Sequence, residues 1–334
     1  MTLRIGLLGA ARIAPAAVVE PAREMDRVQV VAVAARDPRR AEAFARDHGV
    51  PTVFGDYGEL VASAQVDAVY VGLPPSAHAS WTIAALEAGK HVLCEKPFAC
   101  STTEASAMVA AAERAGRVLC EAFHWRYHPL AWRLSEVLAS GRIGAIRSIA
   151  ATFDAPIPDL DDLRHDPRLG GGAMMDLGCY AVQWARFVAG GEPEVSSVQV
   201  TEGVPGIDLA MEARLRFEGG VTAKVGTSMA PDVAVRARLE VVGDAGRIVV
   251  ENPLAPHLGH ALLVDDASGR SHETVAGEST YIHQLRAFVA AALDGASLPT
   301  GGADAIATMR VIEACYAAAG LPPRGGTEER ELRP

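Results

Sequence analysis

Short runs of β-branched residues alternate with alanine-rich stretches through the first 122 residues of the chain. Parallel strands need a helical crossover between them, so this alternation is typical of a parallel sheet wrapped by helices. Two helices carry boundary signals: residues 76–89 run from a serine N-cap to a glycine, and residues 101–116 open with a capping box of Ser101 and Glu104. We expect a doubly wound Rossmann domain over residues 1–122, with strands near residues 3–8, 28–34, 67–72, 91–95 and 117–121.

The pattern changes after residue 122. A helix and a proline-rich loop precede a second helix and a series of strand-like segments, whose apolar and polar residues alternate as in an antiparallel sheet with one exposed face. Residues 123–334 are therefore predicted to form an α+β domain for substrate binding and oligomerisation, with a large open, mostly antiparallel sheet and a loosely ordered tail from residue 323. We expect helices at 130–140, from about 173, at 280–295 and at 302–320, and strands at 145–153, 195–203, 211–219, 221–229 and 235–243.

The outward positions of these strands include isoleucine, valine and methionine, which a monomer would expose to water. An apolar sheet face of this size is typical of an interface between subunits. We therefore expect a homodimer or homotetramer that uses the exposed sheet face.

Composition narrows the class of protein. The net charge of -10, from 41 acidic and 31 basic residues without a long basic run, argues against a nucleic-acid partner. No apolar run reaches about 18 residues, so we expect no membrane span, and a strand that begins at residue 3 leaves no room for a signal peptide. The odd number of cysteines without C-x-x-C spacing predicts reduced thiols, no metal site and a cytoplasmic protein; they are Cys94, Cys100, Cys120, Cys179 and Cys315.

The segment GLLGAARIA, residues 6–14, follows the first predicted strand. Aligning Gly9, Ala11 and Ala14 with the glycines of G-x-G-x-x-G places a dinucleotide pyrophosphate at the N-terminus of the next helix. Two of the three glycines are alanine here, so an ordinary strand-to-helix turn is the alternative.

About twenty residues further on, NAD-preferring folds carry an acid that binds the adenosine ribose. This chain has Ala35 and Arg36 instead, and an arginine can bind the 2′-phosphate of NADP. NADP is therefore favoured, with NAD as the alternative cofactor. In a second interpretation Arg36 is a solvated residue and Asp37 caps the helix that begins at Pro38.

Two further segments carry side chains of the types that are common at functional sites. In HVLCEKPFAC, residues 91–100, Glu95, Lys96 and Pro97 interrupt an apolar strand, and buried charges there need partners, so the triplet is either a solvated strand end or a site. In LGGGAMMDLGCY, residues 169–180, Asp176 and Tyr180 share one helical face, and the glycines permit close approach of a ligand or of another backbone. The alternative is that the aspartate stabilises the helix dipole and the tyrosine is an ordinary half-buried aromatic.

Taken together, AVYVGLPPSAHASWTIAALEAGKHVLCEKP and LGGGAMMDLGCY resemble the Gfo/Idh/MocA family, which includes glucose–fructose oxidoreductase and inositol dehydrogenase. The order and spacing of the motifs agree over nearly the whole chain. The segments VAVAARD and EAFHWRYHP, with tyrosine at 180 where inositol dehydrogenases have histidine, are most similar to the branch of dimeric dihydrodiol and NADP-dependent xylose dehydrogenases.

The resemblance implies roles for particular residues. Lys96 would lie beside nicotinamide and substrate, Tyr180 would be the proton donor or acceptor, and Asp176 would fix the substrate with Arg164 and Tyr281 as further substrate contacts. The Lys96–Pro97 bond is expected to be cis. The implied cofactor-binding residues are Gly9, Ala10, Ala11, Arg12, Ile13, Arg36, Leu73, Pro74, His78, Glu95, Lys96, Trp125 and Arg126, although His78, Trp125 and Arg126 have packing roles as an alternative.

The chemistry agrees with these roles. Free tyrosine has a pKa of about 10, and a neighbouring ammonium such as that of Lys96 favours the phenolate and stabilises a developing alkoxide. We expect an NADP-dependent oxidoreductase that acts on a CH–OH group of a sugar, polyol or related cyclic alcohol. The alternatives are a ketoreductase of a deoxysugar or natural-product pathway and a non-catalytic dinucleotide-sensing regulator, although a regulator has no use for a poised proton donor.

Overall fold

The computed structural model describes residues 1–325, which divide into two units. The first unit contains residues 1–126 and 281–306, and the second contains residues 127–280 and 307–325. The chain thus returns to the first unit after completing the second sheet. The single boundary at residue 122 that we expect from the sequence does not provide for this return. Long-range contacts cause it: Arg27 forms a two-bond ion pair with Asp294, and the Thr300 carbonyl accepts a hydrogen bond from the Glu121 amide. The part of the predicted loose tail beyond residue 325 lies outside the described residues.

The first unit contains a six-stranded parallel sheet in the order β3-β2-β1-β4-β5-β6. The five predicted strands are confirmed, and a two-residue strand, β3, is added. The strand order reverses between β1 and β4, and in open α/β sheets ligands bind at such a reversal, outside the carboxyl ends of the strands. The strands are β1 (Leu3–Leu8), β2 (Val28–Ala34), β3 (Thr52–Val53), β4 (Ala68–Val71), β5 (His91–Cys94) and β6 (Leu119–Glu121).

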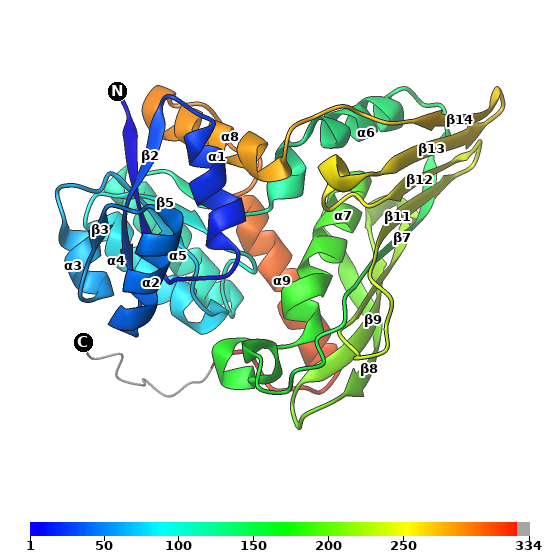
Figure 1. Cartoon of the computed structure of the whole chain (residues 1–334). Helices are drawn as coiled ribbons and strands as arrows, with labels where there is room; N and C mark the ends of the chain where they lie inside the picture. The colour runs from blue at the N-terminus through cyan, green and yellow to red at the C-terminus, as the bar shows by residue number, and fades with distance from the viewer. Residues whose placement is uncertain (326–334) are drawn as a thin grey trace. The chain divides into compact units, whose positions relative to one another are not determined.

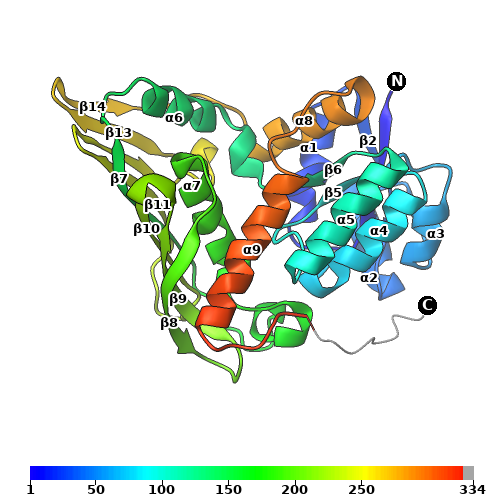
Figure 2. The ribbon, with the colours of Figure 1, turned by 180° about the vertical axis from the view of Figure 1, so that it is seen from behind.

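Helices cover both faces of this sheet (Figures 1 and 2). Right-handed crossovers on either side of the reversal place helices on opposite faces, which gives the doubly wound arrangement. A π-helical turn at Pro15–Val19 leads directly into α1. The helices of the unit are α1 (Glu20–Arg23), α2 (Pro38–His48), α3 (Tyr57–Ala62), α4 (His78–Glu87) and α5 (Thr102–Ala115). The later stretch of chain that returns to this unit adds α8 (Thr280–Asp294).

The two boundary signals read from the sequence have different outcomes. Ser101 caps α5 by accepting from the Glu104 amide, and the Glu104 carboxylate accepts in return from the Cys100 amide, so the capping box is confirmed with a shift of one residue. The serine N-cap predicted for α4 is wrong. A 3₁₀ turn at Pro75–Ala77 contains that serine, and Ala77 takes the N-cap position without a side-chain bond.

The second unit contains an eight-stranded sheet in the order β14-β13-β12-β11-β7-β10-β9-β8. All neighbouring pairs are antiparallel except β7 and β10, which are parallel, so the mostly antiparallel sheet is confirmed. The strands are β7 (Ile146–Asp154), β8 (Glu194–Glu202), β9 (Asp208–Arg216), β10 (Thr222–Ser228), β11 (Arg236–Gly243), β12 (Arg247–Glu251), β13 (Ala261–Asp266) and β14 (Gly269–Glu273). Its helices are α6 (Pro129–Ala139), α7 (Cys179–Ala189) and most of α9 (Ala303–Ala318).

One face of this sheet packs against α7, which lies over β7, β10 and β11 (Figure 1). Alternate strand residues such as Ile149, Val225 and Val241 are buried on this face. Phe153 of β7 contacts the rings of Tyr180 and Trp184 from α7. The core of the second unit therefore fixes the start of α7, which carries the predicted site residue Tyr180 and closely follows the predicted site residue Asp176.

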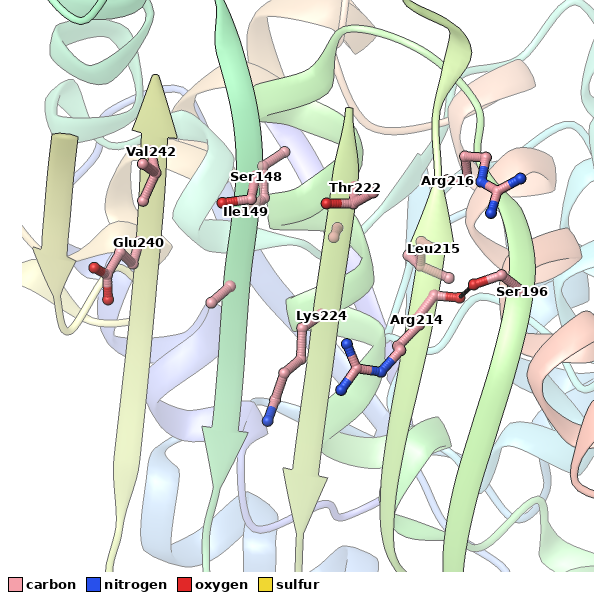
Figure 3. Close-up of a pocket in the computed structure, with 12 residues that line it drawn as sticks. Ser148, Ile149, Ser196, Arg214, Leu215, Arg216, Thr222, Lys224, Glu240 and Val242 are labelled. Carbon is pink, nitrogen blue, oxygen red and sulfur yellow. Dashed lines mark hydrogen bonds between the residues drawn. The ribbon is translucent and has the colours of Figure 1, made fainter. Parts of the chain in front are cut away.

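The opposite face of the sheet is more polar than the sequence predicts. Met211 is only 2 % exposed and points inward, so the expectation of outward methionine is wrong, although Val242 is 36 % exposed. Figure 3 shows this face, where arginine, lysine, glutamate and hydroxyl side chains lie together with apolar residues such as Val242 around an open hollow of about 530 Å³. Cross-strand ion pairs, such as the one between Lys224 of β10 and Glu212 of β9, lie on the same face.

No helix among residues 1–325 is long and apolar enough to cross a membrane. The five cysteines are unbridged, with buried side chains.

Candidate active site

The turn after β1 brings two strand ends into close approach. Gly9 has a φ of 96°, and a Cβ atom there would lie 2.6 Å from the carbonyl oxygen of Gly72, directly after β4. Only glycine fits this position, because a side chain would be strained and would also collide with the backbone. The turn therefore crosses the β1–β4 reversal, where a dinucleotide site is expected.

The two alanines of the motif occupy positions that tolerate a methyl group. Ala14 is fully buried directly before the π-helical turn at Pro15–Val19, and Ala11 is half-buried with its methyl group facing Gly72. Ala10 is half-buried, and Arg12 and Ile13 are exposed. Short side chains that precede a helix N-terminus at a strand reversal fit a pyrophosphate group. The backbone of residues 9–14 therefore has the geometry that a dinucleotide pyrophosphate would need, although two of the three glycines of the motif are alanine.

The end of β2 carries a basic group in place of an acid. Arg36 is exposed and its amide donates to the Tyr57 hydroxyl at 3.1 Å, while Asp37 caps α2 by accepting from the Arg39 amide. The capping role of Asp37 is therefore confirmed. Arg40 was missed by sequence reasoning, although it stands four residues after Arg36 on α2.

Arg40 links this region to the dinucleotide turn. Its guanidinium donates to the Ala10 carbonyl at 3.3 Å. Burial raises the pKa of the Tyr57 phenol, while the hydrogen bond from the Arg36 amide and the charges of Arg36 and Arg40 act in the opposite direction. Two arginines thus lie around one hydroxyl at the end of β2.

His78 contacts the loop after β4. This imidazole is fully buried, with Nε2 2.8 Å from the Leu73 carbonyl and Nδ1 2.9 Å from the Pro97 carbonyl. Leu73 and Pro74 themselves are half-buried. Burial lowers the pKa of His78, so the imidazole is neutral and donates its one N–H to one of the two carbonyls while it packs between the loops after β4 and β5.

The interruption of the strand at Glu95, Lys96 and Pro97 has a direct explanation. The Glu95 carboxylate accepts from the Tyr70 hydroxyl at 2.7 Å and from the Lys96 amide at 3.3 Å. Burial first, and the Glu95 charge second, raise the pKa of Tyr70 well above its ordinary value, so this phenol stays a donor. The Lys96–Pro97 bond is cis, as expected, and Lys96 is half-buried. Tyr70, which sequence reasoning missed, thus satisfies the carboxylate at the strand end.

The remaining first-unit residues lie around the 3₁₀ turn His124–Tyr127 and the start of α8. The Tyr281 ring contacts the His124 ring with centroids 4.2 Å apart. Burial, followed by the Glu95 charge, raises the pKa of Tyr281, which makes it a neutral hydrogen-bond donor at physiological pH. Trp125 is buried and Arg126 is half-buried. Every residue expected to contact the cofactor therefore belongs to the first unit.

Three expected substrate residues lie in the second unit. Arg164 donates from Nε to Asp176 at 2.6 Å and from Nη1 to Asp162 at 3.0 Å. The Asp176 charge is the main factor that raises the pKa of Arg164, so this guanidinium is a permanent cation. Asp176 lies in a π-helical turn, Met174–Gly178, that leads into α7, and such turns are frequent at functional sites.

Tyr180 is the second residue of α7 and is 4 % exposed. Its ring makes an edge contact with Phe153 and lies tilted against Trp184, with centroids 5.6 and 6.2 Å away. The structure thus brings Arg164 and Asp176 into direct contact and places Tyr180 on the same continuous segment, within a packed aromatic group.

The glycine run before this segment accommodates the chain itself. A Cβ on Gly171 would lie 2.4 Å from the Arg164 carbonyl oxygen, and a Cβ on Gly172 would meet Asp208 and Tyr316. At these two glycines the structure shows close approach of the chain's own atoms. The run packs the Arg164 loop against the start of the π-helical turn.

The glycine turn at the strand reversal and Lys96, which follows β5 of the same sheet, fit a nicotinamide-dependent oxidoreductase. The comparisons with known proteins show that the chain is an oxidoreductase of this class. The chain matches "Oxidoreductase family, NAD-binding Rossmann fold" over residues 3–123 and "GFO/IDH/MocA C-terminal domain" over residues 132–249. It belongs to the GFO/IDH/MocA family.

Individual relatives differ in their named reactions. The chain is 36% identical over 321 residues to D-xylose 1-dehydrogenase (NADP(+)) 2 of Haloferax volcanii, covering 95% of this chain and 97% of that one. It is 38% identical over 258 residues to dTDP-3,4-didehydro-2,6-dideoxy-alpha-D-glucose 3-reductase of Saccharopolyspora spinosa, covering 76% of each chain. The crystal structure of KijD10, a 3-ketoreductase from Actinomadura kijaniata in complex with NADP and TDP-benzene, superposes with a TM-score of 0.88 at 28% identity, covering 95% of this chain and 98% of that one.

His78 gives a prediction for stability as a function of pH. Because its folded-state pKa is lowered, the imidazole contributes stability above its unfolded pKa of about 6.5, and this contribution is lost as the pH falls through the folded pKa. We expect the free energy of unfolding, measured by urea titration, to fall from pH 7.5 to pH 5.5, and to fall less steeply in His78→Gln. The exposed His272→Gln is the matched control. Equal slopes in wild type and His78→Gln would contradict the prediction.

Proposed function

We propose that this protein transfers a hydride between NADP and a hydroxyl or carbonyl group of a sugar, polyol or related cyclic alcohol. The observation that carries the proposal is Lys96, held at the end of β5 by the Tyr70–Glu95 contact, on the same sheet edge as the dinucleotide turn. In this proposal Lys96 meets the substrate beside the nicotinamide. Tyr180 and Asp176 are proposed to act on the same substrate.

NADP rather than NAD is proposed from the end of β2. Arg36 and Arg40 supply two cations near the place where an NAD-preferring fold has an acid, and the carboxylate that follows Arg36 in sequence, Asp37, is engaged in capping α2. A 2′-phosphate would gain charge-assisted hydrogen bonds there and meet no repulsion from a ribose-binding acid. The Haloferax volcanii relative is itself named for NADP.

Each side chain has a distinct chemical task in the proposed reaction. Bound NADP supplies a two-electron hydride acceptor, or a donor in its reduced form. Tyr180 takes the hydroxyl proton when the substrate is oxidised and returns it when a carbonyl is reduced, so the proton balance closes in both directions. Lys96 favours the phenolate and stabilises the alkoxide, and Asp176, which Arg164 orients, accepts a hydrogen bond from a second substrate hydroxyl.

A second candidate function is reduction of a nucleotide-linked keto-deoxysugar. Its support is the similarity to the Saccharopolyspora spinosa reductase and to KijD10 over most of the chain. Free aldoses and polyols, a trans-diol and a dTDP-linked keto-deoxysugar should be compared as substrates by nicotinamide absorbance. We expect the highest kcat/KM with a free sugar or polyol. Turnover of the nucleotide-linked sugar alone would instead select the second candidate, and no turnover of any substrate would favour a dinucleotide-sensing regulator.

We also propose that a second copy of the chain covers the open face of the second-unit sheet. The hollow on that face offers Arg214, Lys224 and Glu240, so the surface carries both charges and can pair with itself about a two-fold axis (Figure 3). Light scattering should give at least twice the 35.0 kDa of the chain at micromolar concentration. A mass of one chain would contradict the proposal.

The cofactor assignment predicts a selective loss. We expect Arg36→Ala to weaken NADP binding by about 1.5–3 kcal/mol, or roughly 10- to 150-fold in Kd, because a charge-assisted contact is lost. NAD binding should change little. Fluorescence titration of both cofactors measures this, with the exposed Arg39→Ala as a neighbouring control. An unchanged Kd for NADP would remove Arg36 from the site.

The acid–base assignment predicts a loss of turnover without loss of fold. Tyr180→Phe keeps the ring contacts with Phe153 and Trp184 and removes the titrating oxygen, so kcat should fall by roughly 10²- to 10⁴-fold while NADP binding survives. Lys96→Met should shift the pH–rate profile upward, because the phenol loses its cationic neighbour. Near wild-type kcat in Tyr180→Phe would show that another group carries the proton.

A further inference from the structure

A buried ionic cluster lies beside the turn that carries Asp176, and the proposed reaction does not use it. Asp208, at the start of β9, is fully buried, and its Oδ2 accepts from the Met174 amide at 2.7 Å. Its Oδ1 accepts from the Tyr316 hydroxyl at 2.8 Å and from Arg324 Nη2 at 3.3 Å. We call Asp208, Tyr316 and Arg324 the Asp208 anchor.

The Arg324 side chain is itself enclosed. Its guanidinium stacks on the Tyr316 ring, 3.9 Å from the centroid, and Nη1 donates to the Gly206 carbonyl at 2.6 Å. The side chain is 1 % exposed in the ion pair with Asp208. Donors from the π-helical turn, from α9 and from the chain after α9 therefore converge on this carboxylate of β9.

The carboxylate contacts the backbone of the candidate site at two points. Met174 is the first residue of the π-helical turn, so Asp208 holds one of the amides at the start of that turn. Gly172 lies against Asp208 and Tyr316 so closely that a Cβ atom there would meet both side chains. The anchor thus fixes both the glycine run and the start of the segment that carries Asp176.

Gly172 passes this constraint on to the proposed substrate contacts. Its amide donates to the Arg164 carbonyl at 2.9 Å, and its carbonyl accepts from the Asp176 amide at 3.0 Å. The Arg164–Asp176 ion pair joins the two segments a second time. These hydrogen bonds link Arg164, Gly172 and Asp176 to one another. Asp208, which is buried, bonds the Met174 amide in the same segment.

A role in packing alone does not account for this arrangement. A well-packed apolar side chain is often at least as stabilising as a buried ion pair, and it avoids the cost of desolvating a carboxylate and a guanidinium. An apolar side chain would not fix the direction of the Met174 amide. What the buried charges add is geometric definition at the start of the turn.

We propose that Asp208, Tyr316 and Arg324 are positioning residues, which hold the π-helical turn so that Asp176 and Tyr180 meet the substrate in reactive geometry. The proposal rests on the catalytic roles proposed above for Asp176 and Tyr180. It makes turnover depend on Arg324, a residue that contacts neither of them in the described part of the chain.

Tyr316→Phe is the mildest test, because it keeps the ring that supports Arg324 and removes one hydrogen bond to Asp208. We expect kcat/KM for the sugar substrate to fall about tenfold, mainly through kcat. The Kd for NADP should not change, because the proposed cofactor residues belong to the first unit. A purely structural residue would lower the melting temperature without changing kcat of the folded protein.

Chemical rescue gives a second, independent readout. Arg324→Ala should lose turnover, and millimolar guanidinium should restore it several-fold by filling the space next to Asp208. Urea at the same concentration is the uncharged control. If guanidinium restores no activity to folded Arg324→Ala protein, the proposed role of Arg324 is overturned, and if that variant does not fold, Tyr316→Phe alone decides.

Thr308→Val is the matched control, because it removes a buried hydroxyl that accepts from Arg186 of α7 at 2.7 Å and leaves the anchor intact. We expect it to lower the melting temperature and to keep kcat. Full kcat and kcat/KM in folded Tyr316→Phe, or an equal loss of kcat in Thr308→Val, would overturn the positioning role. Wild-type turnover in Tyr180→Phe would instead overturn the proposed function, so the two failures are distinguishable.

Discussion

The close approach of Gly9 to the Gly72 carbonyl is the constraint on which the first-unit site depends. It lets the chain cross from β1 over the end of β4, and it leaves only short side chains, Ala10 and Ala11, at the point where the strand order reverses. Most of the proposed cofactor contacts are arranged around this crossing. Arg40 bonds the turn itself, and His78 packs between the loop after β4 and the loop after β5.

Three carboxylates at or beside the candidate site are held by hydrogen-bond donors of the chain. Glu95 is satisfied by the buried Tyr70 hydroxyl, Asp176 by Arg164, and Asp208 by three donors from different segments. In each case a carboxylate is held by donors of the chain itself. Groups with this preorganisation cost little to arrange when a substrate binds, which is the physical basis of electrostatic catalysis.

The parts of the structure that the sequence predicts are those set by local pattern. Strand periodicity, the Ser101 cap and the motif order depend on neighbouring residues, and the structure reproduces them. Contacts distant in sequence were not predictable in the same way. Tyr70 becomes a partner of Glu95 only because β4 and β5 are adjacent. Gly172 is explained by Asp208 and Tyr316, both more than thirty residues away.

Two local features were also missed, for different reasons. The π-helical turn at Met174–Gly178 leaves no clear mark in residue type, since its residues fit an ordinary helix. Arg40 did have a signal, because it is a further arginine in the first turn of α2, close in sequence to Arg36, but its position near the turn depends on the Ala10 carbonyl, which is distant in sequence. The inward direction of Met211 depends on the register of β9 in the sheet.

The path of the chain between the units has a consequence for how such a protein can be divided or recombined. The chain passes from one unit to the other at 126/127, 280/281 and 306/307. A fragment that stopped at residue 126 would lack α8, with its buried Leu285 and Phe288, and would lose the ion-pair partner of Arg27. Exchange of one unit between related genes therefore needs several simultaneous junctions, so a single fusion point cannot transplant the nucleotide-binding unit intact.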